Sequence, residues 1–148
     1  MERGSGILMH ISSFPAKYGI GTMGKEAFQF VDFLKKSGQK YWQILPIGPT
    51  SFGDSPYQSF STFAGNPYFI DFDLLREDGS LNLEDYSEID WGNKPDRVDY
   101  EKIFKSRFKV LKAAYSRDRI RKKAEIDNFR FNHSYWICLL YTSDAADD

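Results

Sequence analysis

The sequence predicts an α/β fold, and three features of its first half lead to that prediction. Two compact apolar runs, at residues 6–14 and 41–45, have the length of buried strands. Between them, residues 25–36 carry apolar side chains at helical spacing. Turn-forming glycines and prolines separate the three segments. The order of strand, helix and strand is that of a parallel βαβ unit with a right-handed crossover.

The first run, GILMHISSF, is bounded by Gly6 and Pro15 and is predicted to be a buried strand. A glycine-rich loop follows, and the helix is predicted to begin after Gly24 and to end at Gly38. Glu26 in its first turn and two lysines in its last turn complement the helix dipole. Its apolar stripe consists of Ala27, Phe30, Val31 and Leu34, widened by Phe28 and Phe33.

The second run, from Tyr41 to Leu45, is the second predicted buried strand and is ended by Pro46 and Pro49. Sites in parallel α/β sheets lie beyond the carboxyl ends of the strands. The two loops that leave such ends, residues 12–24 and 48–67, are therefore the candidate binding segments.

The second half of the chain differs from the first in composition. After Phe72 it becomes acidic and rich in turns, and no strand is predicted there. The basic stretch at residues 116–136 is interpreted as a solvated helix face rather than a ligand site. Residues 101–115 are amphipathic, with a predicted apolar face of Ile103, Phe104, Phe108, Leu111 and Tyr115.

Composition excludes several classes of function. The net charge of the 148 residues is −1, so no basic surface for nucleic acid is predicted. No apolar run approaches the roughly 20 residues that cross a bilayer, and no convincing signal peptide is present. We therefore expect a cytoplasmic protein without a membrane partner. Cys138 is the single cysteine, which excludes an intrachain disulfide and a cysteine-cluster metal site, and the two histidines lack ligand spacing.

The aromatic content, 17 %, is high and has two possible sources. One is a large buried core, which accounts for most aromatic residues in proteins. The other is a set of flat surfaces that hold sugars or bases. Both interpretations apply to the stretch SFGDSPYQSFSTFAGNPYF at residues 51–69, which is aromatic and polar but contains no lysine, arginine or histidine.

Four stretches within residues 5–75 carry a resemblance to a known family: GILMHISSFP, KYGIGTMG, DFLKKSGQKYWQILPIGPT and SFGDSPYQSFSTFAGNPYFID. They closely resemble the start of the 4-α-glucanotransferases, the amylomaltases or disproportionating enzymes of glycoside hydrolase family 77. The resemblance continues more loosely through residue 136. The shared pattern is long and ungapped, so it is specific, and it indicates an N-terminal fragment of such an enzyme.

The resemblance implies a fold and a division of the chain. The family has a (β/α)₈ TIM barrel with helical insertions, so residues 1–75 would be the first two βα units and residues 76–136 the start of a helical insertion. A complete barrel needs about 250 residues, so this chain would hold only part of one.

The resemblance also implies a reaction. These enzymes transfer α-1,4-glucan segments between malto-oligosaccharides with retention of configuration. Retention requires a carboxylate nucleophile and a carboxylic acid/base. In the family these groups lie on later strands, so no catalytic residue is expected here, and Asp32, Asp54 and Asp71 are not candidates for those roles. No metal or organic cofactor is expected.

Substrate contacts are expected in the loop at residues 48–67, because pyranose rings have apolar faces and polar rims. By resemblance, Tyr57 and Ser55 match residues that contact sugar near the cleavage point. Phe52 stands where many relatives have a tyrosine of a second glucan-binding groove, and it keeps the ring without the hydroxyl. Asp54 also belongs to the candidate set, although capping of the turn at Ser55 is the commoner role for such a residue.

The sequence also predicts roles for three further aromatic side chains. Phe60 and Phe63 are expected to be packing residues. His10, in the first predicted strand, either faces the site or is a hydrogen-bonded core histidine, and the sequence favours the second interpretation.

The C-terminal residues do not continue the pattern of the chain. CLLYTSDAADD extends neither the helical stripe nor a strand pattern. Cys138 to Asp147 can be spelled codon by codon as the transposase end sequence that is used to prepare sequencing libraries. We therefore expect residues 137–148 to be adapter read-through and Cys138 not to be native.

Two alternatives to a truncated transferase remain at this point. One is a small non-catalytic carbohydrate-binding module, which the strand–helix–strand order disfavours because such modules are usually β-sandwiches. The other is a fragment of a hydrolase of the α-amylase group. Only sequence beyond these 148 residues distinguishes the hydrolase from the transferase.

Overall fold

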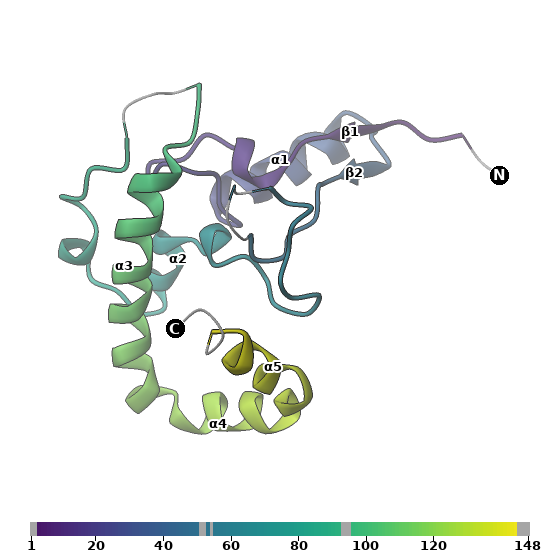
Figure 1. Ribbon diagram of the computed structural model, residues 1–148. Helices are drawn as coiled ribbons and strands as arrows, with labels where there is room; N and C mark the ends of the chain where they lie inside the picture. The colour runs from purple at the N-terminus through teal and green to yellow at the C-terminus, as the bar shows by residue number, and fades with distance from the viewer. Residues whose placement is uncertain (1–2, 51–52, 54, 93–95, 145–148) are drawn as a thin grey trace.

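The computed structural model describes residues 3–50, 53, 55–92 and 96–144, the last four for their backbone only. Figure 1 shows a βαβ unit at one end, the long helix α3 beside it, and two further helices that turn back under the aromatic loop. The helices and strands, in chain order, are β1 Gly6–Leu8, α1 Lys25–Lys36, β2 Tyr41–Gln43, α2 Phe72–Glu77, α3 Tyr100–Arg121, α4 Lys123–Asn132 and α5 Ser134–Asp144.

The two strands are parallel, as the sequence predicted. Gly6, Ile7 and Leu8 of β1 lie opposite Tyr41, Trp42 and Gln43 of β2. Beyond β1, the chain continues along Trp42, whose indole N–H donates to the Met9 carbonyl at 2.7 Å. The chain then forms a 3₁₀ turn at Ile11–Ser13 instead of extending the strand.

The prediction that both strands are buried is wrong. Only the central residue of each three-residue strand is partly covered, while Leu8 is 59 % and Tyr41 62 % exposed. The covered side faces α1, where the rings of Phe14, Phe30 and Trp42 meet at centroid distances of 5.3–5.7 Å. The described chain places one helix against one face of this sheet, so the other face stays open.

Helix α1 has the predicted bounds. Gly24 is its N-cap, and Gly38, at φ = 68°, lies just past its end in the left-handed region that favours glycine. Ala27 and Leu34 are the buried members of the predicted stripe. Phe28, Val31 and Phe33 are exposed, so the wider stripe is only partly used.

Helix α3 buries a different face from the one predicted. Its buried residues are Ile103, Arg107, Val110 and Ala114. They form a stripe next to the aromatic stripe that the sequence predicted. Of the predicted face, Ile103 is buried and Leu111 packs on the core, whereas Phe104 is 62 % exposed and Phe108 and Tyr115 are also exposed.

Arg107 explains this rotation, because it is fully buried and occupies the centre of the α3 stripe. Its guanidinium lies 4.2 Å from the centre of the Phe72 ring and donates to the backbone carbonyls of Ile70 and Tyr18. Burial lowers the pKa of Arg107 to about 10, so it stays charged at neutral pH. One side chain thereby joins α3 to the loop after β1 and to the segment between the second loop and α2.

The end of α3 is tied to the turn after α2 by ion pairs. Arg117 makes two hydrogen bonds to Asp85, and Arg121 bonds to Asp78 and Asp118. The Arg117 guanidinium holds the pKa of the Asp85 carboxyl below its usual value. Part of the basic stretch that was predicted to be a solvated helix face therefore makes ion pairs within the fold.

Helix α5 includes the segment that the sequence did not assign to a helix. The helix Ser134–Asp144 continues past Cys138, so the prediction that the helical pattern stops at Cys138 is wrong. Leucine is a strong helix former, and this propensity is sufficient without a continuous stripe. The origin of residues 137–148 stays a prediction.

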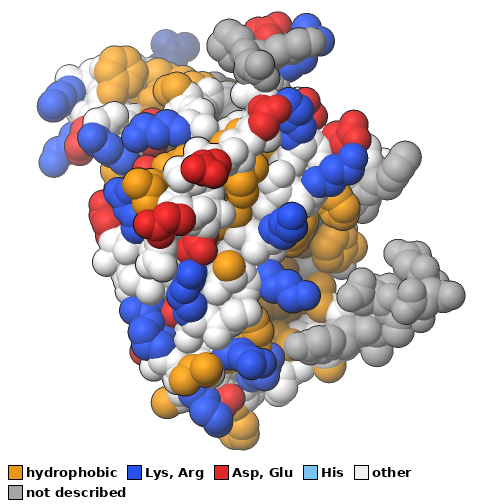
Figure 2. Space-filling view, turned by 90° about the vertical axis from the view of Figure 1, so that its left-hand side faces the viewer, with side chains coloured by type: hydrophobic (Ala, Val, Ile, Leu, Met, Phe, Trp, Pro, Cys, Tyr) orange, Lys and Arg blue, Asp and Glu red, His pale blue; other side chains and the backbone are white. Residues whose placement is uncertain are grey.

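The face formed by α3 carries acidic and basic side chains mixed with apolar ones (Figure 2). In the part of the chain that the structure describes, no helix combines the length and the apolar character required to span a bilayer.

Candidate functional site

The loop at residues 48–67 leaves β2 and folds back on itself. Thr50 and Ser59 form an isolated antiparallel bridge across it. Past the bridge, Ser59 donates to the Ser61 carbonyl at 2.7 Å, and the Ser61 hydroxyl accepts from the Ala64 N–H at 3.1 Å. Serine hydroxyls thus replace regular secondary structure, which keeps the loop ordered without a strand partner.

Two of the four predicted substrate-binding residues lie at the exposed tip of this loop. Tyr57 is 73 % exposed, and its backbone N–H donates to the Ser55 hydroxyl at 3.4 Å. The Gln58 N–H donates to the Ser55 carbonyl, which closes a tight turn around Pro56. The Tyr57 ring is therefore presented to solvent by a turn that fixes its backbone. The other two predicted residues, Phe52 and Asp54, lie outside the described residues.

The two predicted packing residues of the loop differ. The Phe63 ring contacts Tyr135 and Trp136 of α5, with centroids 5.5 and 6.2 Å away. Both side chains are exposed, Phe63 by 59 % and Phe60 by 58 %, so within the described chain the predicted packing is limited to the ring contacts of Phe63. These ring contacts join the loop to α5, which lies below the loop in Figure 1.

A small hollow of about 120 Å³ lies at the base of the loop, where both strands end. His10, just beyond β1, lines it, and Thr50 and Pro56 line it from the loop that follows β2. The His10 Nδ1 and the Thr50 hydroxyl are buried and have no hydrogen-bond partner among the described residues. Burial lowers the pKa of the His10 imidazole below its ordinary value.

His10 therefore does not fully match either expectation, the hydrogen-bonded core histidine or the histidine that faces the site. It does line a hollow at the strand ends, but its Nδ1 lacks the hydrogen bond of a satisfied core histidine. Its ring meets the edge of Phe69 at 5.4 Å. Sequence reasoning missed Thr50, although a polar residue directly after the strand-ending Pro49 was a usable signal.

The segment after the loop is held by short side-chain caps. Asn66 accepts a hydrogen bond from the Tyr68 N–H at 2.9 Å and so begins a 3₁₀ turn. Asp71 accepts from the Leu74 N–H at 2.9 Å as the N-cap of α2, and from the Thr22 hydroxyl at 2.5 Å. Both Asp71 oxygens serve the fold, in agreement with its exclusion as a catalytic group.

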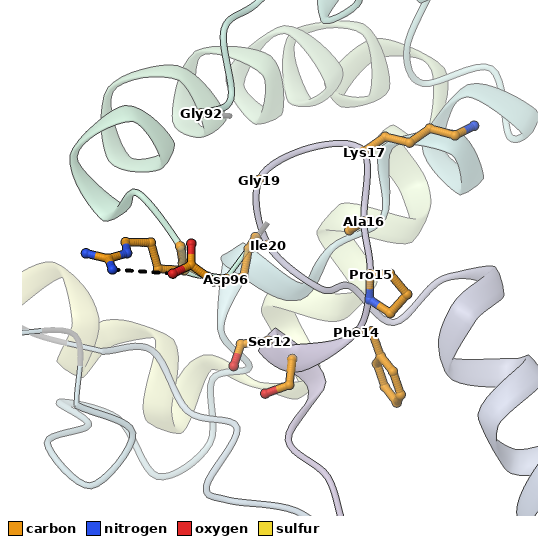
Figure 3. A pocket seen from close by; sticks show the side chains of 12 residues that line it. Ser12, Phe14, Pro15, Ala16, Lys17, Gly19, Ile20, Gly92 and Asp96 are labelled. Carbon is orange, nitrogen blue, oxygen red and sulfur yellow. Dashed lines mark hydrogen bonds and ion pairs between the residues drawn. The ribbon is translucent and has the colours of Figure 1, made fainter. Parts of the chain in front are cut away.

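A larger cleft of about 610 Å³ adjoins the hollow and is drawn in Figure 3. The loop at residues 12–20 forms one wall and residues 96–98 contribute to the other, where Asp96 and Arg97 make an ion pair at 3.3 Å. Ser12 and Ile20 line both the hollow and the cleft. The two loops that leave the strand ends therefore share one continuous depression.

The described residues supply binding groups to this depression rather than a pair of catalytic carboxylates. Among the described residues, no aspartate or glutamate lines the hollow, and the one carboxylate that lines the cleft, Asp96, is paired with Arg97. Within the described residues, no group of three or more His, Cys, Asp or Glu side chains is arranged to hold a metal ion.

Comparison with known proteins identifies the family. The family model of glycoside hydrolase family 77, described as 4-alpha-glucanotransferase, matches residues 9–141, which is most of the chain. The chain belongs to the 4-α-glucanotransferase family.

Individual 4-α-glucanotransferases are similar over nearly the whole chain. The enzyme of Clostridium butyricum is 52 % identical over 129 residues, which cover 87 % of this chain and 26 % of that protein. The enzyme of Thermus thermophilus is 43 % identical over 143 residues, which cover 93 % of this chain and 27 % of that protein. The chain thus spans about a quarter of the length of the curated relatives it matches.

A solved structure of the family has the same fold in this region. Amylomaltase from Streptococcus agalactiae, in complex with acarbose, matches with a TM-score of 0.86 and 48 % identity. The match covers 92 % of this chain and 28 % of the amylomaltase chain. Because the chain belongs to the 4-α-glucanotransferase family, neither of the two alternatives, a carbohydrate-binding module or an α-amylase-group hydrolase, is favoured.

Proposed function

We propose that this chain is the N-terminal part of a 4-α-glucanotransferase that transfers α-1,4-glucan segments between malto-oligosaccharides. The single observation that carries the proposal is the family match over residues 9–141, which includes β2 and the whole aromatic loop. The position of that loop beyond the carboxyl end of β2 supports it, because α/β folds place their ligands there.

In this proposal, the βαβ unit is the start of a (β/α)₈ barrel. Residues 1–75 are its first two βα units, and residues 76–136 begin a helical insertion. The open face and edges of the β1–β2 pair support this division, since barrel strands are covered on both sides and have no free edge.

The role of this chain in the reaction is to bind and orient the glucan. A retaining transfer proceeds through two displacements, with a carboxylate nucleophile and a carboxylic acid/base. The described residues that line the depression offer no such pair. The part of the enzyme that follows this region supplies the reacting carboxylates.

Tyr57 is the principal sugar contact in the proposal, and its exposed ring and fixed backbone support that role. An aromatic face packs against the apolar C–H face of a pyranose, while the phenol and the Ser55 hydroxyl reach the polar rim. We assign Phe52 and Asp54 to the same substrate-binding set, following the resemblance of the loop.

A chimeric enzyme tests the proposal. Residues 1–136 of this chain replace the equivalent region of the Streptococcus agalactiae amylomaltase, to which they are similar. Incubated with maltotriose, the chimeric enzyme is expected to produce glucose together with longer malto-oligosaccharides, measured by chromatography of the products. An inactive but folded chimera would contradict the proposed function.

The 148-residue chain by itself provides the matching negative test. It is expected to release no glucose from maltotriose, because the reacting carboxylates are assigned to the rest of the enzyme. Measurable glucose release would show that this assignment is wrong.

A further inference from the structure

The hollow between His10 and Thr50 contains two polar groups that the fold leaves unused. Nearly all buried polar groups in proteins have a hydrogen-bond partner, and a buried group without one destabilises the fold. Here the His10 Nδ1 and the Thr50 Oγ1 both lack a partner among the described residues and both belong to the lining of the same hollow. Two such groups at one place indicate a missing partner that lies between them.

The size of the hollow limits what that partner is. About 120 Å³ equals the volume of roughly four water molecules in the liquid and is well below the 300 Å³ or more of a ligand pocket. A complete pyranose ring together with its hydroxyls does not fit. A hydroxyl or hydroxymethyl group does.

The chemistry of the lining selects a neutral partner. Among the described residues, no lysine, arginine, aspartate or glutamate lines the hollow, and Ile20, Leu45 and Phe69 make much of its wall apolar. A charged group would lose its hydration there without compensation. A neutral imidazole nitrogen and a threonine hydroxyl together match one O–H group, which donates to one and accepts from the other.

The location of the hollow connects it with the loop. Pro56, which lines the hollow, stands between Ser55 and Tyr57, the residues proposed to contact sugar. We propose that the hollow is a binding site for one neutral hydroxyl group of the bound glucan, held by His10 and Thr50. This inference rests on the proposed function, because it adds a contact to the same substrate.

The test uses the chimeric enzyme with Thr50→Val, which removes the hydroxyl and keeps the shape of the side chain. Thr50→Ser keeps the hydroxyl, and Thr62→Val, at an exposed position of the same loop outside the hollow, is the matched control. Acarbose is the probe for the dissociation constant, measured by calorimetry, and maltotriose is the substrate for kcat and KM.

We expect Thr50→Val to weaken acarbose binding and to raise KM by about five- to tenfold, the effect of one hydrogen bond. Thr50→Ser and Thr62→Val should stay within about twofold of the parent. Without ligand, Thr50→Ser and Thr62→Val should keep the thermal midpoint of the parent, and Thr50→Val should keep or raise it, because it removes a buried hydroxyl that has no partner in the unliganded protein.

Water is the other source of a hydroxyl, and the same measurements distinguish it. If Thr50→Val lowers the thermal midpoint but leaves the acarbose dissociation constant unchanged, the partner is an internal water or a group from the rest of the enzyme, and the inference is overturned. No change in either quantity overturns it as well. A folded parent chimera that neither binds acarbose nor transfers would overturn the proposed function and this inference with it.

Discussion

The βαβ unit with its loop, residues 6–71, and the helical layer, residues 72–121, are stabilised in different ways. The helical layer contains its own core around Phe72, Tyr86 and Trp91, and ion pairs tie the turn after α2 to α3. The βαβ unit has a core on one side only, and its loop presents aromatic rings to solvent. The helical layer packs around a core to which Tyr18 of the first loop contributes, whereas the βαβ unit leaves one face of its sheet and its loop open to contact something else.

The largest expected effect concerns the core of the helical layer. Phe72 is fully buried and its ring meets Tyr18, Tyr86 and Trp91, so Phe72→Ala should lower the free energy of unfolding by about 3–5 kcal/mol. Urea unfolding followed by circular dichroism measures the change. Phe104→Ala, on the exposed stripe of α3, is the control and should cost less than about 1 kcal/mol. Equal costs would remove the distinction between the buried core around Phe72 and the exposed stripe of α3.

Arg107→Met should have the next largest effect, because Arg107 connects the two regions. Its loss leaves the carbonyls of Ile70 and Tyr18 without their donor, at a cost of about 2–3 kcal/mol. Arg119→Met, at an exposed position of the same helix, is the control and should be nearly neutral. If the two variants unfold at the same urea concentration, Arg107 does not hold the regions together.

Tyr57→Ala addresses the exposed side of the comparison and should leave stability unchanged. In the chimeric enzyme it should lower kcat/KM for maltotriose by a factor of about 10–100, or about 1–3 kcal/mol, as expected for one pocket contact. Tyr57→Phe separates the ring from the hydroxyl, and Phe60→Ala is an exposed aromatic control in the same loop. An unchanged kcat/KM in Tyr57→Ala would mean that the loop serves only as scaffolding.

The smallest effects concern pH and should appear in two separate windows. The folded pKa of Asp85 lies below its ordinary value of 3.8, so its stabilisation is present above that pH and is lost as pH falls further. The folded pKa of His10 lies below 6.5, so its contribution is lost as pH falls below 6.5. In thermal unfolding from pH 7.5 to 3, Asp85→Asn should flatten the lower window and His10→Leu the upper one. Each change should be less than about 1 kcal/mol.

Local signals in the sequence were sufficient for the βαβ unit and its loop. Gly24 and Gly38 set the bounds of α1, and the two apolar runs predicted parallel strands, because these features depend on residues close in sequence. The turn at Ser55–Tyr57 was likewise marked by Pro56. Strand lengths were overestimated because the 3₁₀ turn at Ile11–Ser13 depends on packing against distant segments.

The remaining features depend on contacts between distant residues. Helix α3 has two candidate stripes, and the buried one includes an arginine whose acceptors are carbonyls 37 and 89 residues away. No periodicity in α3 indicates that these carbonyls are present. The placement of His10 and Thr50 in the lining of one hollow could not be predicted for the same reason, since each is ordinary in its own segment.

Gly19 lies close to the backbone of Trp91, and this closeness limits which residues position 19 tolerates. Gly19 has φ = 77°, and a Cβ at this position would lie 2.5 Å from the Trp91 carbonyl oxygen. A glycine in the first loop is therefore matched to a backbone position more than seventy residues later. Because the obstacle is a backbone oxygen, no substitution at position 91 relieves it, and a side chain at position 19 is accommodated only if the backbone of one of the two segments moves.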